Sequence, residues 1–318
     1  MKAAIKIGFL LNLLSQAWFL TAQEGKNMLP LSNKLLLNPS FAGWDKNTNV
    51  QTGLSFMSQS KKNLNHVFYL TYDTYSEKLK GGVGYYFYQG LRGSLNTNET
   101  GMGFTYSKTL PTGKGKSFVP SFNINYKLAT KQWFVQMMEP LTPPGQELLR
   151  YNVILPKAGV LWDSPARQIG LSLACSIHID MANAGEHSPP NIPEVIFYYS
   201  QLIEGKQKGL ISRPFEMRPE IVVLYSGEIF LTRTLLQISD INHNYGLYIQ
   251  NNFAANLHGI GTIYGWNFNR FKLNLSMGSA FNFESQNFAF FGEIALSLML
   301  PYTHFDKKNP WSTPKKLF

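Results

Sequence analysis

Apolar and polar side chains alternate along most of the chain with a period of two residues. The segment Phe271–Phe283 is a clear case, because every second residue from Phe271 to Met277 is apolar and the residues between them are Lys, Asn and Ser. Successive side chains of a β-strand face opposite sides. The pattern therefore predicts strands with one apolar and one polar face, and no segment after residue 22 shows the sustained 3.6-residue period of a helix.

The alternation recurs often enough to predict fourteen strands. They span residues 49–58, 64–73, 81–90, 97–108, 117–128, 151–162, 167–179, 194–204, 215–226, 229–240, 245–254, 256–268, 271–283 and 288–300. Several of these segments are longer than the five or six residues of an ordinary strand. An even number of antiparallel strands returns the chain to the side from which it started, so both ends of the sheet are expected on one side.

Two architectures accommodate long antiparallel strands of this kind. A soluble sandwich hides the apolar face in a core, whereas a transmembrane barrel turns it toward lipid. The polar faces here are mainly Asn, Ser, Thr, Gln and Gly, and charged residues make up only 15% of the chain, against roughly 25% in an average soluble domain. A sheet within a bilayer must also close, because an open edge would leave backbone groups unpaired. We therefore predict an all-β transmembrane antiparallel β-barrel of about 14 strands with both termini periplasmic.

The first residues have the features of a secretory signal peptide. Lys2 and Lys6 precede a mostly apolar stretch, and Thr21-Ala22 supplies small residues for cleavage. An N-terminal membrane anchor is the alternative, although the stretch is short for a spanning helix. Cleavage would remove two lysines and no acid, which lowers the net charge from +10 to +8. The predicted segments are a signal peptide (1–22), a periplasmic N-terminal segment (23–48), an outer-membrane barrel (49–300) and a basic periplasmic tail (301–318).

Two long connections follow the fifth and seventh predicted strands, at residues 129–150 and 180–193. Barrels of this type have short periplasmic turns and longer extracellular loops, so we expect both connections outside the cell. Proline lowers the entropy lost when a loop becomes ordered, which makes a proline-rich loop a candidate surface for a protein partner. The alternative is that proline only stiffens the loops against proteolysis. The adjacent prolines of the two loops are Pro143, Pro144, Pro189 and Pro190.

The segment before the first strand is another candidate partner site. Asn38-Pro39 favours a turn, and Gly43 permits a close approach of the backbone. Phe41 and Trp44 supply apolar anchors. We interpret the segment either as a plug-like turn packed against the periplasmic rim or as a docking element for a periplasmic partner.

The tail after the last strand is basic and includes Lys307 and Lys308. It either remains solvated or docks onto an acidic partner. Nucleic acid is not an expected partner, because no basic and aromatic binding module is present.

Motifs for catalysis and cofactor binding are weak. The fragment Gly113–Ser117 lacks the first glycine of a phosphate loop, because Leu110 stands at that position, and we interpret it as a turn. Ser176, His178 and Asp180 share a strand face that is predicted to point into the lumen, where a lipid-cleaving triad is not expected. Acidic and histidine residues near this strand lack the spacing of a metal site. We therefore expect no enzyme, no cofactor and no metal.

Several short motifs follow one another along the chain, at Asn38–Gly43, Tyr69–Asp73, Gly81–Gly84, Pro156–Trp162, Ile169–Ser172 and Gly292–Leu296. The order of these motifs resembles that of the PorP/SprF family of Bacteroidetes outer-membrane proteins, which is associated with type IX secretion and gliding motility. The Asn-Pro-x-aromatic-Ala-Gly element is the most specific of them.

This resemblance implies a non-enzymatic outer-membrane component that supports the secretion or surface attachment of cargo proteins. Its implied partners are secreted cargo, type IX secretion subunits and outer-membrane lipid. The alternative function is an outer-membrane diffusion channel or hydrophobic-solute transporter. The lumen distinguishes the two, because a channel needs an open polar bore, whereas a scaffold can be filled by bulky inward residues such as Tyr86 and Tyr88.

Overall fold

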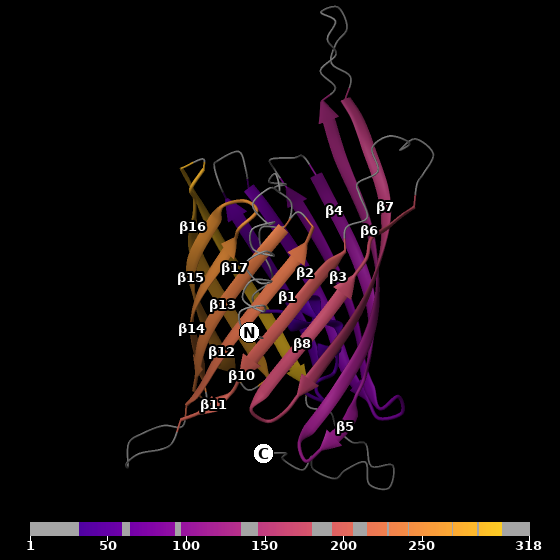
Figure 1. Cartoon of the computed structure of the whole chain (residues 1–318), viewed down its shortest axis with the longest axis vertical. Helices are drawn as coiled ribbons and strands as arrows, with labels where there is room; N and C mark the ends of the chain where they lie inside the picture. The colour runs from indigo at the N-terminus through magenta and orange to yellow at the C-terminus, as the bar shows by residue number, and fades with distance from the viewer. Residues whose placement is uncertain are drawn as a thin grey trace, which may run out of the picture.

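Strands whose two faces differ in polarity close into a barrel in the computed structural model of this chain (Figure 1). The structure describes residues 32–58, 64–92, 97–134, 146–179, 193–205, 215–227, 229–240, 242–268, 270–284 and 286–300. Neighbouring strands are antiparallel, and the first pairs with the last from Thr48↔Leu300 to Ser58↔Phe290, which closes the sheet. No helix in these ranges is both long and apolar enough to span a bilayer.

The barrel wall consists of strand segments that follow one another around the circumference. Their bounds are β1 Thr48–Ser58, β2 Leu64–Ser76, β3 Gly81–Arg92, β4 Thr97–Lys108, β5 Leu110–Gly113, β6 Lys116–Phe134, β7 Gln146–Asp163, β8 Arg167–Ala174, β9 Ile177–Ile179, β10 Glu194–Gln201, β11 Ile203–Glu204, β12 Glu216–Ser226, β13 Ile229–Ser239, β14 His243–Asn252, β15 Leu257–Phe268, β16 Phe271–Asn282 and β17 Asn287–Leu300.

Three barrel strands are each interrupted once. One interrupted strand consists of β4 and β5, which both pair with β6. The second consists of β8 and β9, which both pair with β7, and the third of β10 and β11, which both pair with β12. The described wall is therefore a closed barrel of fourteen strands, and this part of the sequence prediction is confirmed. We call the end where β1 begins and β17 ends the terminal end, and the opposite end, which holds the β1–β2 and β6–β7 connections, the hairpin end.

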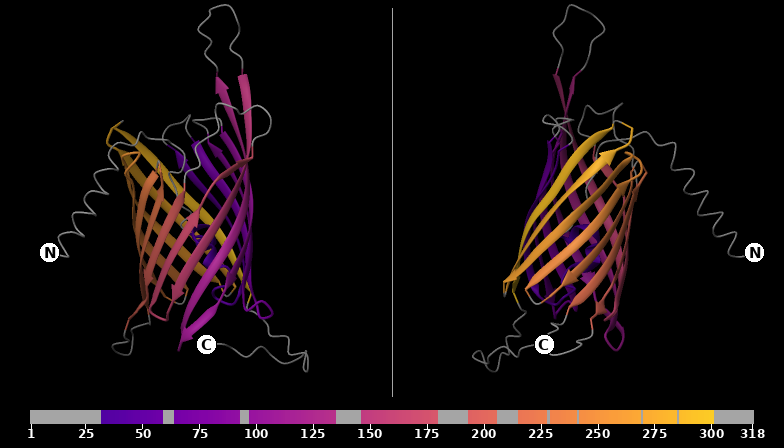
Figure 2. Two further views of the ribbon diagram at one scale, coloured as in Figure 1. Left: turned by 45° about the vertical axis from the view of Figure 1, so that its right-hand side comes forward. Right: turned by 90° about the vertical axis from the view of Figure 1, so that its left-hand side faces the viewer.

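The β6–β7 hairpin is longer than the sequence pattern predicted. Residues 129–134 and 146–150, which were predicted as loop, are strand, and they pair from Ala129↔Tyr151 to Phe134↔Gln146. They stand beyond the rim of the barrel as a two-stranded ribbon (Figure 2). The predicted loop at residues 129–150 was therefore too long at both ends. The two strands of this hairpin continue to pair with each other beyond the point where they have neighbours in the barrel wall.

The two faces of the wall differ as the alternation predicted. On β16, Leu275 is 38% exposed and faces outward, whereas its neighbour Asn274 is 7% exposed and faces the lumen. Outward residues of the other strands are likewise large and apolar, among them Leu247, Ile260 and Phe290. The outer surface is thus the apolar band that a bilayer requires.

Inward tyrosines lie flat against the wall because each faces a glycine on the next strand. Tyr86 is paired with Gly103, and a Cβ atom at Gly103 would lie 2.2 Å from the Tyr86 ring. Tyr248 covers Gly261 in the same way, at 2.5 Å. The Tyr86 hydroxyl donates a hydrogen bond to Oδ1 of Asn123 at 2.9 Å. The tyrosine rings therefore lie along the inner surface of the wall, and the centre of the lumen is occupied by another part of the chain.

Two apolar clusters lie inside the barrel, so the lumen is less uniformly polar than the sequence suggested. The first joins Leu37 and Phe41, which precede the barrel, to inward residues of β6, β7, β10, β12 and β13. The second is formed by inward residues of β1 and β13–β17, including Tyr248 and Phe291. The first cluster exists because a segment of the chain is seated in the lumen.

Candidate functional site: the luminal plug and the barrel mouth

Residues 32–44, which we call the plug, form two short helical elements before the barrel. Helix α2 spans Lys34–Leu37, and the 3-10 helix η2 spans Pro39–Phe41. Asn33 caps α2 by accepting hydrogen bonds from the backbone of Leu35 and Leu36, and the Asn38 side chain accepts one from Ser40 N at 2.9 Å. No helix was predicted here, because a single helical turn is too short to display a 3.6-residue period.

Hydrogen bonds attach the plug to two opposite arcs of the wall. Side chains of the wall bond to its backbone, and its own polar side chains bond back to the wall. On one side, Ser32 N donates to Glu293 of β17 at 3.1 Å and Gly43 N to Asp73 of β2 at 2.9 Å. On the other, Ser172 of β8 donates to Leu37 O at 3.1 Å. The plug is therefore fixed across the bore, and its indigo ribbon lies inside the barrel in Figure 1.

Asn38 occupies a close-fitting seat between β7 and β8. Its Nδ2 donates to the carbonyls of Val160 and Leu171, at 3.2 and 3.3 Å. A Cβ atom at Gly159 would lie 2.4 Å from Asn38 Oδ1, so the wall has room for Asn38 only because a glycine faces it. Asn38 is 1% exposed. The seat thus fixes both the position and the orientation of the plug.

The C-terminal end of the plug approaches β2 and β3 with similar closeness. Gly43 has φ of 56°, in the left-handed region that glycine tolerates. A Cβ atom there would lie 2.6 Å from the carbonyl oxygen of Thr74, and one at Gly82 would lie 1.8 Å from the carbonyl oxygen of Ala42. The short motifs of the sequence analysis therefore meet in space, because Asn38–Gly43 contacts Asp73, Gly82, Gly159 and Gly170.

The apolar side of the plug packs against one arc of the wall. Phe41 meets Tyr198 of β10 edge to face, with ring centroids 5.1 Å apart, and Trp44 meets Phe41 at 6.1 Å. Leu37 and Phe41 are buried with Val119, Leu161 and other inward residues of this arc. Such burial stabilises each large side chain by roughly 1.5–3 kcal/mol relative to exposure. The plug is thus held by both apolar contacts and hydrogen bonds.

A charged cluster lies beside this apolar contact. Glu220 of β12 accepts a hydrogen bond from the Tyr198 hydroxyl at 3.0 Å, and its carboxylate lies 3.4 Å from Arg233 of β13 and 3.9 Å from Lys34 of the plug. Burial lowers the pKa of Lys34 to about 8, because desolvation outweighs the attraction of Glu220. One carboxylate thus links two strands of the wall to the plug.

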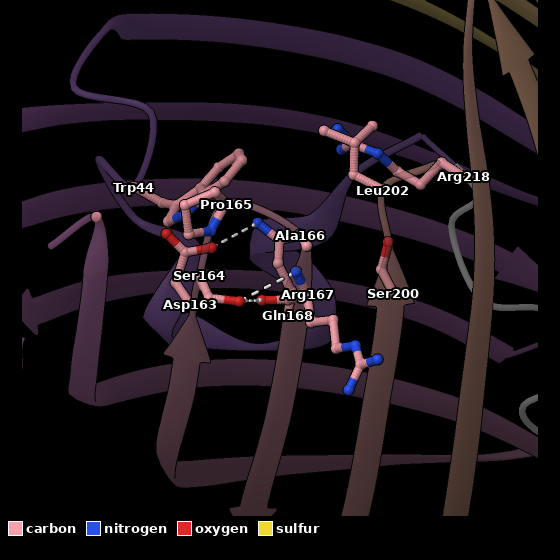
Figure 3. Close-up of a pocket in the computed structure, with 11 residues that line it drawn as sticks. Trp44, Asp163, Ser164, Pro165, Ala166, Arg167, Gln168, Ser200, Leu202 and Arg218 are labelled. Atoms are coloured by element: carbon pink, nitrogen blue, oxygen red, sulfur yellow. Dashed lines mark hydrogen bonds between the residues drawn. The ribbon is translucent and has the colours of Figure 1, made fainter. Parts of the chain in front are cut away.

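Two pockets open at the terminal end of the lumen, beside the plug. The first, of about 230 Å³, has Trp44, Asp163 and Gln168 on one side and Ser200, Leu202 and Arg218 on the other (Figure 3). The second, of about 380 Å³, includes Arg218, Gln237, Asn244, Asn267 and Lys272. Arg218 belongs to both pockets. We call the two pockets together the barrel mouth.

The predicted partner-binding residues fall into two groups. Asn38, Pro39, Phe41 and Gly43 are buried in the plug, and Trp44 is half-buried where the plug meets the barrel mouth. Their contact with a partner stays a prediction. Pro143, Pro144, Pro189, Pro190, Lys307 and Lys308 lie outside the described residues, as do the signal peptide and the tail.

Sequence reasoning missed the charged residues of β12 that lie at the barrel mouth and beside the plug. Glu216, Arg218 and Glu220 stand at alternate positions of one strand, and all three would have been assigned to the inward face by the period of two. That spacing was the available signal, but what these side chains face depends on the plug, which is far away in sequence. Within the described ranges, no group of three or more His, Cys, Asp or Glu could hold a metal ion.

Comparison with known proteins gives a family match and distant structural likenesses. The family model described as "Type IX secretion system membrane protein PorP/SprF" matches residues 31–302. CdiB from Acinetobacter baumannii is 10% identical, with a TM-score of 0.45, over 79% of this chain and 60% of that chain. Omp33 of the same organism is 9% identical, with a TM-score of 0.43, over 80% and 97%. The KdgM porin is 5% identical, with a TM-score of 0.37, over 79% and 98%. No curated protein sequence matches.

Proposed function

Since the chain belongs to the PorP/SprF family of type IX secretion system membrane proteins, we propose that it is a plugged scaffold that supports the secretion or surface attachment of cargo proteins. The protein is an outer-membrane component of type IX secretion. The proposal concerns its task there. It holds partner-binding segments at the two ends of a rigid barrel and passes no solute through the lumen.

The plug is the observation that carries this proposal. It bonds to β17 through Glu293 and to β2 through Asp73, the two strands that flank β1, and it bonds across the lumen to β8 through Ser172. A diffusion channel needs a continuous polar bore, whereas here Leu37 and Phe41 are buried in an apolar cluster within the lumen. The plug therefore favours the scaffold over the alternative of a channel or hydrophobic-solute transporter.

The orientation is part of the proposal. We infer that the terminal end faces the periplasm, because single-chain barrels with an even number of strands usually have short periplasmic turns. The connections at the terminal end include the short turns Glu77–Lys80 and Lys114–Gly115. The β6–β7 ribbon then projects outside the cell, and the proline-rich residues 139–145 belong to the connection between its two strands.

Replacing residues 139–145 with a Gly/Ser linker of equal length is expected to reduce cargo attachment. The ribbon itself stays paired from Ala129↔Tyr151 to Phe134↔Gln146, so the barrel should fold and insert normally. The measurement is the amount of a surface-attached secreted protein on whole cells, at matched abundance of the barrel. The same exchange at residues 93–96, a connection without proline at the same end, is the control and should have no effect.

Normal surface display by the 139–145 variant would remove this loop as the cargo contact. The same exchange at residues 187–193 then tests the second proline-rich loop. If neither exchange reduces display, cargo contact at the hairpin end is wrong, and the barrel mouth is the remaining surface.

A further inference from the structure

Two cations of the barrel mouth lie close to the plug. Arg218 of β12 and Lys272 of β16 both line the second pocket, and both contribute to the lowered pKa of Lys34. Arg233 adds a fourth positive charge on the far side of Glu220. The carboxylates that act on this group are Glu220 and Asp163. The charges that line the two pockets balance, with Arg167, Arg218 and Lys272 against Asp163, Glu216 and Asp240, so anion binding depends on which cations lack a carboxylate partner.

Arg218 and Lys272, two of the three cations of the mouth, have no carboxylate of their own. Within the part of the chain that the structure describes, neither Arg218 nor Lys272 forms an ion pair within 4.0 Å. The two acidic residues that line the second pocket, Glu216 and Asp240, form no ion pair with either cation. Glu216 is exposed, and Asp240 accepts hydrogen bonds from the backbone of its own turn, at Asn242 and His243. A guanidinium at the wall of a lumen is a strong and directional partner for an incoming carboxylate.

The remaining lining of the mouth suits a peptide better than a free inorganic anion. Side-chain amides surround the cations, and amides complement the N–H and C=O groups of a peptide backbone. Gln168 is 7% exposed, donates to Asp163 at 3.0 Å and has its Oε1 without a donor, so a small rotation of the amide would let it accept from a ligand N–H. Trp44 on one side of the first pocket and Leu202 on the other supply apolar contacts for a neighbouring side chain (Figure 3).

We propose that the barrel mouth binds a peptide segment of a partner protein through a carboxylate of that segment, with Arg218 as its main contact and Lys272 as the second cation. Trp44 and Leu202 contact an adjacent apolar side chain, and Gln168 accepts a hydrogen bond from the backbone. The carboxylate belongs either to an acidic side chain or to a chain terminus. This inference rests on the proposed scaffold function and names the chemistry of its partner at the terminal end.

The test is the binding of short labelled peptides to the purified full-length protein in detergent, by fluorescence anisotropy at low and moderate salt. The first peptide contains adjacent Phe and Glu and has blocked ends. The second has Gln in place of Glu, and the third has Gln and a free C-terminal carboxylate. We expect the first or the third to bind at least ten-fold more tightly than the second, and the preferred one identifies the source of the carboxylate. Binding should weaken as the salt concentration rises.

Arg218→Gln should lower the affinity for the preferred peptide at least ten-fold. Lys46→Gln, at an exposed cation outside both pockets, should change it less than two-fold. Lys272→Gln provides a second variant in case Arg218→Gln fails to fold, which heat-modifiable migration on gels would show. Equal binding of all three peptides, equal binding by wild type and Arg218→Gln, or full displacement by equimolar phosphate would overturn the proposal. Cargo display on cells is a separate readout, so its outcome distinguishes failure of the scaffold function from failure of this site.

Discussion

Replacing Glu220 with leucine is expected to lower the free energy of unfolding by about 3–5 kcal/mol, the usual cost of removing one partner from a buried ion pair. Glu220 is 5% exposed, and its carboxylate faces Arg233, which is fully buried, as well as Lys34 and the Tyr198 hydroxyl. Leucine fills a similar volume but leaves these groups without the carboxylate. The loss should appear as a lower midpoint of urea unfolding for the refolded barrel in detergent.

Glu216→Leu is the matched control for this change. Glu216 lies four residues earlier on the same strand and is exposed, so the substitution should change stability by no more than about 0.5 kcal/mol. If both variants unfold at the same urea concentration, the cluster around Glu220 contributes little and the plug is held mainly by its apolar contacts and backbone hydrogen bonds.

Replacing Leu275 with arginine is expected to cost about 2–4 kcal/mol, because a charge on the lipid face is most unfavourable near the middle of the bilayer. Leu275 lies near the centre of β16 and points outward. Leu110→Arg is the control, since Leu110 also points outward but belongs to β5 at the terminal end. There the cost should be about 0–1 kcal/mol. Equal losses at the two leucines in lipid vesicles would contradict the assignment of the membrane band.

The wall of the barrel could be predicted from the sequence because its signal is local. A period of two along each strand separates outward residues such as Leu275 from inward residues such as Asn274, whatever the distant parts of the chain do. The predicted count and order of the strands were therefore confirmed. The β6–β7 ribbon was underestimated, because residues that pair beyond the membrane need no apolar outer face.

The plug and the mouth could not be predicted in the same way. A one-turn helix such as α2 has no periodic signal, and each of its contacts joins residues far apart in sequence, as in Ser32 with Glu293. Asn38 was singled out for its turn chemistry, but its seat against Gly159 depends on how the barrel closes. Arg218 was not singled out from the sequence, because its setting depends on Lys34 and Lys272, which are far from it along the chain.

Conductance across a planar lipid bilayer tests the central claim most directly. A barrel whose lumen is crossed by residues 32–44, bonded to strands around the wall, should insert without producing a steady ionic current. The Glu220→Leu variant, in which the plug is more weakly held, should show at most brief openings. A stable, ohmic conductance from the wild-type protein would contradict the plugged scaffold and would establish the diffusion channel in its place.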